Sequence, residues 1–316
     1  MKKGNYKYVY GPVPSRRLGR SLGVDLVPFK TCTYDCIYCQ LGRTTQKTVE
    51  RREYLPTGAI IDELKEALAE NGNADYITIS GSGEPTLHVD IGTIIGEIKS
   101  LSDIPVAVIT NSSLMHDDKV RTELLAADLV LPSLDAGSGS LFEYVNRPHK
   151  KIRFREMLDG LIEFRKQYKN KMWLEIFLLA GINIFPDEME KLAGLVSLIA
   201  PEMLYLNTAT RPPCEEYAVG VNNEHLHELA EYFDCTVKIA GERVNHSEMA
   251  TGGALVDDQA ILAILSRRPC TVEDIAEGLR VPVNSVIKSI YPLVNSGMIA
   301  ARRGNDSIFY ERQFSK

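Results

Sequence analysis

The sequence predicts an α/β protein of six β/α units followed by a small second domain. Its length of 316 residues fits about two domains. Short apolar runs alternate with longer amphipathic segments from about residue 20 to 235, and a different pattern of short helices begins after residue 254. With 44% hydrophobic and 25% charged residues, the chain has ample apolar side chain for a full core, which excludes global disorder.

The six predicted strands are continuous apolar or β-branched runs rather than alternating ones, as is typical of parallel strands covered on both faces. They span residues 23–27, 74–80, 105–110, 128–133, 172–179 and 203–207. The helices predicted between and after them, from apolar positions at helical spacing, span residues 60–71, 91–101, 117–126, 154–168, 186–199 and 222–232. Six such units make most of a barrel, or a doubly wound sheet.

Five of the predicted strands lead into short runs that are rich in Gly, Ser, Thr or Asn. In a parallel barrel, the loops that leave the carboxyl ends of the strands build the active site. The same residue types are ordinary turn residues, but five such endings in register favour a functional site. The runs begin at Ser80, Thr110, Ser133, Ala180 and Asn207.

Residues 242–254 carry Asn, His, Ser, Thr and two adjacent glycines with little periodicity, and we predict a linker there. The linker separates a first domain, residues 1–241, from a second, residues 255–316. Three short helices followed by a hairpin, which is the winged-helix arrangement, are predicted for the second domain. The helices span residues 255–267, 271–278 and 283–295, and the hairpin strands span 298–303 and 307–312.

Charge and cysteine content narrow the class of protein. Lys plus Arg number 36 against 42 Asp plus Glu, and the net charge of -6 argues against a general polyanion binder. No stretch reaches the roughly 18 apolar residues of a membrane span, and residues 1–6 lack the apolar core of a signal peptide. We therefore expect a cytoplasmic protein without a membrane partner. Six cysteines are too few for a disulfide scaffold in this length, and three of them crowd together, which indicates a metal site.

Cys32, Cys36 and Cys39 are separated by gaps of three and two residues, just after the first predicted strand. Thiolates at this spacing can reach three corners of one iron-sulfur cluster. A closed zinc site needs four protein ligands, and no fourth Cys or His follows at finger or ribbon spacing, since the next histidine is His88. The pattern favours a cluster with an open coordination position over a structural metal knot or reduced loop thiols.

With this motif, the chain resembles the radical S-adenosylmethionine (SAM) superfamily over roughly residues 11 to 235. The resemblance implies a partial (β/α)6 barrel of TIM-like type. It also implies a 4Fe-4S cluster on the three cysteines, with SAM chelated to the fourth iron by its amino and carboxylate groups. Tyr38, between the last two cysteines, matches the family position that packs near the adenine.

The resemblance further implies an oxygen-sensitive, anaerobic enzyme with oxidoreductase chemistry. An electron donor such as a flavodoxin or ferredoxin would reduce the cluster, SAM would be cleaved, and the resulting 5′-deoxyadenosyl radical would abstract hydrogen from a substrate. The sequence does not specify this substrate.

A second match follows the second predicted strand. Gly83-Glu84-Pro85 resembles the glycine-rich family motif that holds the methionyl ammonium by a backbone carbonyl and a carboxylate, with Ser82 where many members have Gly. A cationic ammonium needs such acceptors. Because carboxylates favour helix N-termini, Glu84 can also be interpreted as a helix cap.

Three further positions are implied to bind SAM. Asn111, Ser133 and Asp135 stand where family members place polar groups for the carboxylate and ribose of the cofactor. Ser133 and Asp135 are equally suited to turns. Cys214, after the sixth predicted strand, could face the substrate or serve packing alone.

Two basic groups could clamp a phosphate or carboxylate of the substrate, because arginine presents a bidentate fork. The alternative is a solvated face. The groups are Arg16, Arg17 and Arg20 before the first predicted strand, and Arg147, His149, Lys150 and Lys151 after the fourth.

Within the superfamily, residues 11–19 and the run that begins at Gly83 resemble the branch related to wyosine-forming tRNA enzymes. Those enzymes carry a second cluster on extra N-terminal cysteines, whereas no cysteine precedes Cys32 here. The expected substrate is a small molecule or an RNA, and modification of tRNA is one alternative function.

The predicted winged helix could contact nucleic acid through residues 283–295. Residues 255–316 contain 8 Lys plus Arg against 7 Asp plus Glu, so charge gives this interpretation little support. A protein contact or a lid beside the barrel is equally compatible with the arrangement. A redox-sensing regulator, in which the cluster controls binding of nucleic acid, is a third hypothesis.

Overall fold

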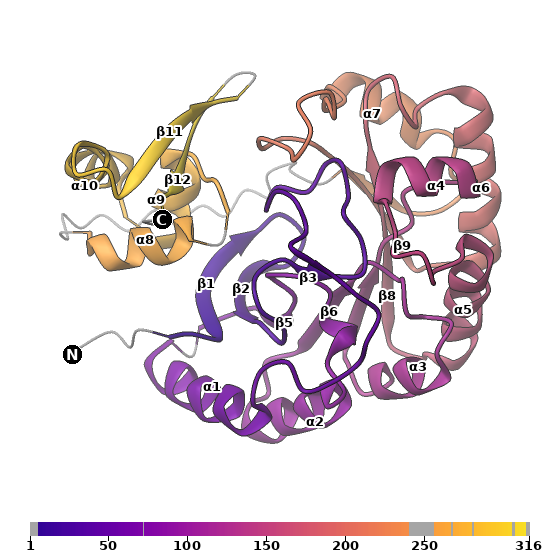
Figure 1. Ribbon diagram of the computed structural model, residues 1–316, viewed down its shortest axis with the longest axis horizontal. Coiled ribbons are helices and arrows are strands. Elements are labelled where there is room, and N and C mark those ends of the chain that lie inside the picture. The colour runs from indigo at the N-terminus through magenta and orange to yellow at the C-terminus, as the bar shows by residue number, and fades with distance from the viewer. Residues whose placement is uncertain are drawn as a thin grey trace.

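The computed structural model describes residues 6–71, 73–239, 256–266, 268–279, 281–304 and 307–313. The predicted linker at 242–254 and the domain boundary at 241 lie outside these ranges. An eight-stranded sheet curves through the larger part of the molecule in the order β1-β2-β5-β6-β7-β8-β9-β10 (Figure 1). Its strands are β1 (Val9–Ser15), β2 (Gly19–Val24), β5 (Tyr76–Ile79), β6 (Val106–Thr110), β7 (Leu129–Pro132), β8 (Lys171–Leu178), β9 (Met203–Thr208) and β10 (Val237–Ile239).

Every neighbouring pair from β2 to β10 is parallel, and only β1 is antiparallel to its neighbour. From β2 onward, the strands of this sheet follow one another across the sheet in the same order as along the chain. The order therefore does not reverse, as it does in a doubly wound sheet. The sheet is therefore wound in one direction, as in an open barrel. The carboxyl ends of its parallel strands all meet at one edge, which we call the barrel mouth.

Helices cover the outer face of the sheet (Figure 1). The six predicted helices are confirmed to within three residues at each end, and α2 and α6 have the predicted bounds. The short helix α4 was not predicted. The helices are α1 (Thr57–Asn71), α2 (Ile91–Leu101), α3 (Asp118–Leu124), α4 (Gly139–Asn146), α5 (Phe154–Gln167), α6 (Pro186–Ile199) and α7 (Asn223–Ala230).

The predicted start of the sheet is wrong in two respects. Strand β1 was missed because it contains Gly11, Pro12 and Pro14, which weaken a strand pattern and are tolerated here because β1 is an edge strand. The first parallel strand is 19–24 rather than 23–27, because its pairing with β5 begins at Ser21. The turn between β1 and β2 inserts Leu18 among apolar residues of β6 and β7, which fills the barrel interior.

The C-terminal residues form three helices and an antiparallel hairpin, in the predicted order, with an apolar cluster of their own. The third helix has the predicted bounds. This module packs on the barrel through Val13 of β1 and through an ion pair of 3.2 Å between Arg211 and Asp274. Its elements are α8 (Asp258–Leu265), α9 (Val272–Leu279), α10 (Val283–Asn295), β11 (Ile299–Arg303) and β12 (Ile308–Arg312).

Within the described ranges, no helix is both long enough and apolar enough to span a bilayer.

Candidate functional site

The three clustered cysteines lie on the long loop that connects β2 to α1. Cys32 ends the two-residue strand β3 (Thr31–Cys32), which pairs in parallel with β4 (Gln46–Lys47). Cys36 and Cys39 lie on the turn between these two strands, and the N–H of Cys39 donates to the carbonyl of Cys36 at 3.2 Å. The short ladder and the turn together fix the backbone that carries the thiols.

Backbone hydrogen bonds attach this cysteine loop to distant parts of the chain. The N–H of Ile37 donates to the carbonyl of Val145 at the end of α4 (3.0 Å), and the N–H of Glu215 donates to the carbonyl of Ile37 (2.9 Å). The N–H of His149 donates to the carbonyl of Thr33 at 2.8 Å. The loop is thus held over the barrel mouth by segments that follow β7 and β9.

Each thiol sulfur of the motif accepts a hydrogen bond from a side-chain nitrogen. The three donors come from the cysteine loop itself, from the loop after β6 and from the end of α4. The pairs are Lys30 Nζ to Cys39 Sγ at 3.2 Å, Asn111 Nδ2 to Cys32 Sγ at 3.5 Å and Asn146 Nδ2 to Cys36 Sγ at 3.5 Å.

Burial keeps two of the thiols protonated at neutral pH. Burial, followed by the charge of Glu84, raises the pKa of the Cys32 thiol to about 12. Burial, followed by the charge of Asp135, raises the pKa of the Cys36 thiol well above its usual value. Such thiols lose their protons when a cation binds the sulfurs, as iron does.

The donor set fits an iron-sulfur cluster better than a single ion. Among the described residues, no group of three or more His, Cys, Asp or Glu side chains is arranged around one metal ion. A cubane does not require such an arrangement, because its cysteines bind different irons. Lys30 is 3% exposed and its Nζ contacts Cys39, while no described carboxylate forms an ion pair with it. Since a buried cation needs a counter-charge, this position suits an anionic group of thiolates, sulfide and iron.

Glu84 organises the loop after β5. Its carboxylate is 2% exposed and caps the short 3-10 helix η1 (Pro85–Leu87), accepting from the Thr86 N–H at 3.1 Å. It also accepts from the hydroxyls of Thr86 and Thr110, both at 2.6 Å, and from the Asn111 N–H at 2.8 Å. A carboxylate has about four acceptor sites, so protein donors use most of its capacity. The helix-cap interpretation of Glu84 is therefore confirmed.

Gly83 packs directly against the cysteine loop. A Cβ at this position would lie 1.8 Å from the carbonyl oxygen of Thr31, which no side chain can do. The N–H of Glu84 donates to that carbonyl at 3.1 Å, and the N–H of Lys30 donates to the carbonyl of Ser82 at 2.6 Å. Glycine is required here because two backbones approach each other closely.

Tyr38 and Asp135 form a second hydrogen-bonded unit. The Tyr38 hydroxyl and the Asn146 amide both donate to Asp135 Oδ2, the latter at 2.7 Å, while the Phe177 N–H donates to Oδ1 at 3.1 Å. The ring of Tyr38 stacks on Phe177 with centroids 3.9 Å apart. Burial raises the pKa of Asp135 to about 6, although these hydrogen bonds oppose the shift.

The structure thus brings most of the predicted cofactor residues into two units. Glu84 bonds Asn111, which bonds Cys32, and Asp135 is joined to Cys36 through Asn146. Ser133 takes part through its backbone, donating to the carbonyl of Thr110 and accepting from the hydroxyl of Ser112.

The first predicted basic group does not form one clamp. Arg17 forms an ion pair with Glu175 of β8. Burial, followed by the charges of Arg211 and Arg268, lowers the pKa of Arg16 to about 10. Arg17 is therefore engaged with the sheet, while Arg16 is buried near two other arginines.

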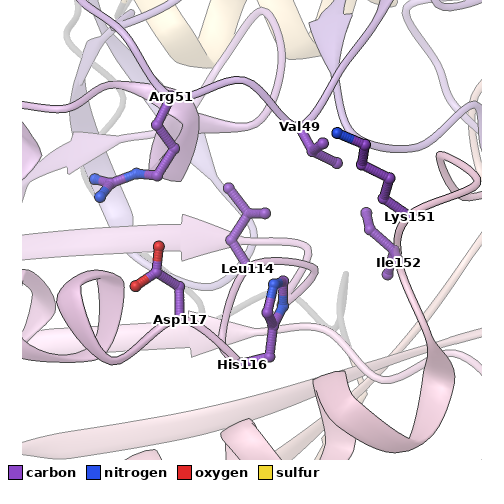
Figure 2. Close-up of a pocket in the computed structure, with 7 residues that line it drawn as sticks. All are labelled: Val49, Arg51, Leu114, His116, Asp117, Lys151 and Ile152. Atoms are coloured by element: carbon purple, nitrogen blue, oxygen red, sulfur yellow. The ribbon is translucent and has the colours of Figure 1, made fainter.

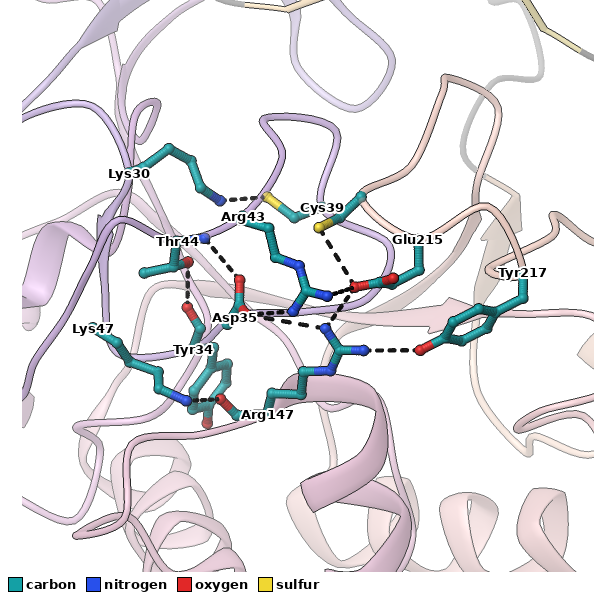
Figure 3. A network of polar contacts seen from close by, with 11 residues as sticks. Lys30, Tyr34, Asp35, Cys39, Arg43, Thr44, Lys47, Arg147, Glu215 and Tyr217 are labelled. Atoms are coloured by element: carbon teal, nitrogen blue, oxygen red, sulfur yellow. Dashed lines mark hydrogen bonds and ion pairs between the residues drawn. The ribbon is translucent and has the colours of Figure 1, made fainter.

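The second basic group is divided between a polar network and the surface. Arg147 NH1 pairs with Glu215 at 2.7 Å, and Arg43 of the cysteine loop pairs with the same carboxylate at 2.5 Å (Figure 3). Arg147 also donates to the hydroxyl of Tyr217 at 2.8 Å (Figure 3). Because its fork is already used, Arg147 is a link between the loops, while Lys150 and Lys151 are exposed.

Cys214 lies in the loop after β9, beside this network, with its sulfur 3.9 Å from Glu215 Oε1. Burial, followed by the charge of Glu215, raises the pKa of its thiol.

A pocket of ≈ 280 Å³ is lined by residues from the segment after β4, the loop after β6 and the segment before α5 (Figure 2). None of its lining residues belongs to the predicted cofactor site. Arg51 in its wall is held by Glu123 and by the carbonyls of Thr86 and His88, at 2.9 Å and 3.0 Å. The lining residues are Val49, Arg51, Leu114, His116, Asp117, Lys151 and Ile152.

Sequence reasoning missed Lys30, Asn146 and Glu175. Glu175 could have been found, because it is an acid inside the apolar run of a predicted strand, where a buried partner is needed. Asn146 gave no signal, since it is 110 residues from the cysteine it contacts. The only signal for Lys30 was its position two residues before Cys32 in the sequence.

Comparison with known proteins identifies relatives over the whole chain. A model of the Radical SAM superfamily matches residues 26–196. The chain is 35% identical over 308 residues to UPF0026 protein MJ1312 of Methanocaldococcus jannaschii, covering 95% of this chain and 94% of that protein. It is 42% identical over 305 residues to a protein named GTPase Obg of Brachyspira hyodysenteriae, covering 96% of this chain and 45% of the longer protein. The sequence here contains no Gly-x4-Gly-Lys-Ser/Thr phosphate-binding motif.

Solved structures share the fold at low sequence identity. SuiB of Streptococcus suis bound to S-adenosylmethionine gives a TM-score of 0.52 at 14% identity, over 69% of this chain and 50% of SuiB. A radical SAM methyltransferase of Sphaerobacter thermophilus gives a TM-score of 0.51 at 14% identity, over 69% of this chain and 65% of that enzyme. The chain therefore spans about half the length of SuiB, and these likenesses establish the fold alone.

Proposed function

The chain belongs to the radical SAM superfamily and to the UPF0026 protein family, and we propose that it cleaves SAM to start hydrogen abstraction from a substrate held at the barrel mouth. It is an enzyme, and the cofactors of its superfamily are a 4Fe-4S cluster and SAM. The substrate class is the part of the activity that the site does not specify.

We assign the cluster to the sulfurs of Cys32, Cys36 and Cys39. When bound and reduced, the cluster supplies the electron that splits SAM into methionine and a 5′-deoxyadenosyl radical. We base this assignment on the three sulfurs, because each accepts a hydrogen bond from a side chain of a different segment of the fold. This convergence of donors on three thiols is the observation that supports the proposal most strongly.

The other residues of the predicted cofactor site are assigned to different parts of SAM. Glu84 shapes the loop after β5 and holds the Asn111 backbone. Because protein donors use most of the capacity of its carboxylate, we assign the ammonium of SAM to backbone carbonyls of that loop. Tyr38, whose ring and hydroxyl are fixed by Phe177 and Asp135, is the residue that we assign to packing near the adenine. Asn111, Ser133 and Asp135 remain the residues that we assign to the carboxylate and ribose of the cofactor.

The test is reconstitution of the protein with iron and sulfide under anaerobic conditions, followed by dithionite and SAM. We expect a 4Fe-4S spectrum and formation of 5′-deoxyadenosine. A cluster-loaded protein that yields no 5′-deoxyadenosine, in the presence of cell extract as a source of substrate, would remove the proposal.

Two variants sharpen this test. Cys36→Ala removes a proposed ligand, and both the cluster and the product should be lost. Cys235→Ala removes a thiol after α7, outside the proposed site, and should leave both unchanged. Equal behaviour of the two variants would contradict the assignment of the cluster.

Modification of tRNA and contact of nucleic acid by the C-terminal module stay predictions. The third helix of the module carries one cation, Lys288, and exposes Ile287 and Tyr291, 49% and 71% exposed. This surface lacks the positive charge with which proteins contact phosphates. A gel shift with bulk tRNA at low salt tests both predictions.

A further inference from the structure

Lys30, Asn111 and Asn146 form a set of nitrogen donors in which each thiol of the cysteine motif has one partner. The distances to sulfur are 3.2 Å for Lys30, 3.5 Å for Asn111 and 3.5 Å for Asn146. Each nitrogen belongs to a different segment of the chain, so the pairing is produced by the tertiary fold and not by local sequence. A donor on every sulfur is a property that a structural loop does not need.

Lys30 is the charged member of this set. Its side chain is 3% exposed, and among the described residues its ammonium makes no ion pair with a carboxylate. Burial of an ammonium without a counter-charge is unfavourable. The fold nevertheless fixes this residue in the left-handed region at φ 59°, where a non-glycine residue is strained.

Three backbone hydrogen bonds hold Lys30 in this conformation. Its N–H donates to the carbonyl of Ser82 at 2.6 Å, and its carbonyl accepts from the N–H groups of Thr45 and Gln46 at 3.2 Å and 3.1 Å. The ammonium is thus aimed at Cys39 by an arrangement that the surrounding loops determine. An anionic group on the Cys39 side would offset the cost of this arrangement.

Asn111 and Asn146 also donate to cysteine sulfurs, but through neutral amides. Asn111 Nδ2 also donates to the hydroxyl of Thr33 at 2.8 Å, and Asn146 Nδ2 also donates to Asp135 at 2.7 Å. Both amides are therefore oriented with nitrogen, and not oxygen, toward the sulfurs. Asn146 is 2% exposed, so little water competes for its contact.

We propose that Lys30, Asn111 and Asn146 are positioning residues that set the reduction potential of the cluster through its cysteine sulfurs. This inference rests on the proposed placement of the cluster on Cys32, Cys36 and Cys39. A hydrogen bond or positive charge at a ligand sulfur draws electron density from the cluster and stabilises the reduced state. Lys30 acts most strongly, because a charge-assisted hydrogen bond is roughly twice as strong as a neutral one.

The experiment measures the midpoint potential of the anaerobically reconstituted protein by redox titration with electron paramagnetic resonance. Lys30→Met should move the potential to more negative values, and Asn146→Leu should move it in the same direction by about half as much. Lys30→Arg retains the charge, and its potential should lie close to that of the wild type. The matched control is Lys47→Met, which removes an exposed lysine of β4 that donates to the carbonyl of Arg147, and it should not change the potential.

Each outcome decides between the proposals. Wild-type protein that holds no 4Fe-4S cluster on these cysteines defeats the proposed function itself. A normal wild-type cluster whose potential is unchanged in Lys30→Met and Asn146→Leu overturns only the present inference. Weaker binding of SAM to Lys30→Met at an unchanged potential also overturns it, because Lys30 would then act on the cofactor.

If Lys30→Met does not retain a cluster, the midpoint potentials of Lys30→Arg and Lys30→Gln are compared instead. A more negative potential in Lys30→Gln supports the inference, because Gln fills the space and donates a hydrogen bond without the charge. Equal potentials in the two variants contradict it.

Discussion

The carboxylate of Glu84 accepts a hydrogen bond of 2.8 Å from the backbone N–H of Asn111, and this bond joins the loop after β5 to the loop after β6. Through the amide of Asn111, the same connection reaches the sulfur of Cys32. A residue predicted to bind a ligand therefore also holds two loops of the site in register.

Replacement of Glu84 by Ala should destabilise the apoprotein by about 3 kcal/mol, because several buried donors lose their acceptor and each costs about 1–3 kcal/mol. Denaturation by urea measures the change. Glu190→Ala, which removes an exposed carboxylate of α6, is the control and should change the stability by less than about 0.5 kcal/mol. Equal stability of the two variants would show that the Glu84 hydrogen bonds are not structural.

Substitution of two glycines by alanine should have opposite effects. Gly83→Ala places a Cβ 1.8 Å from the Thr31 carbonyl, so we expect a loss of about 3 kcal/mol and a displaced cysteine loop. Gly96→Ala in the exposed middle of α2 meets open space and should add about 0.5–1 kcal/mol of helix stability. Thermal unfolding of both variants checks the signs, and stabilisation by Gly83→Ala would contradict the close packing.

The apoprotein should lose stability as pH rises through the pKa of Asp135. Burial raises the pKa of this carboxyl from 3.8 to about 6, so the folded state binds the proton more tightly than the unfolded state. The destabilising effect of ionisation is absent below the unfolded pKa and complete above pH 6, where it is about 3 kcal/mol at 1.36 kcal/mol per pKa unit.

The stability difference between wild type and Asp135→Asn isolates this group. Wild type should gain about 2.4 kcal/mol relative to the variant when the pH is lowered from 7 to 4. Urea titrations at several pH values measure it. A difference that does not vary with pH would mean that Asp135 has an ordinary pKa in the folded protein.

Cys214→Ser should leave the iron and sulfide content of the reconstituted protein unchanged. The sulfur of Cys214 contacts Glu215 at 3.9 Å, and Cys214 belongs to the loop after β9 rather than to the cysteine loop. Chemical assay of iron and acid-labile sulfide provides the measurement. A lower iron content, with an unchanged circular dichroism spectrum, would indicate that Cys214 is a further ligand.

Local patterns predicted the elements well where they are regular. The bounds of α2, α6 and α10 follow from apolar spacing and from their neighbouring Pro, Gly and polar residues. The failures occurred where local signals oppose the tertiary structure. Strand β1 contains two prolines and forms because β2 pairs with it, and α4 begins with Gly-Ser, which reads as a loop.

The candidate site also has a part that local sequence predicted and a part that it did not. The cysteine spacing predicted a cluster, because its ligands are close in the sequence, and the family resemblance that includes Gly83-Glu84-Pro85 implied SAM as the cofactor. The partners of these residues are distant, as with Asn146, or already engaged with the protein, as with Arg147. Pairings of this kind leave no periodic or compositional trace.

The order of apolar runs and the three closely spaced thiols were enough to determine a β/α architecture and a metal-dependent chemistry, since both follow from covalent neighbours. Only the folded chain decided that Glu84 is used by protein donors and that Lys30 is buried against a cysteine sulfur. The reason is that burial and hydrogen bonding depend on contacts between segments that are distant in the sequence and that tertiary folding brings together.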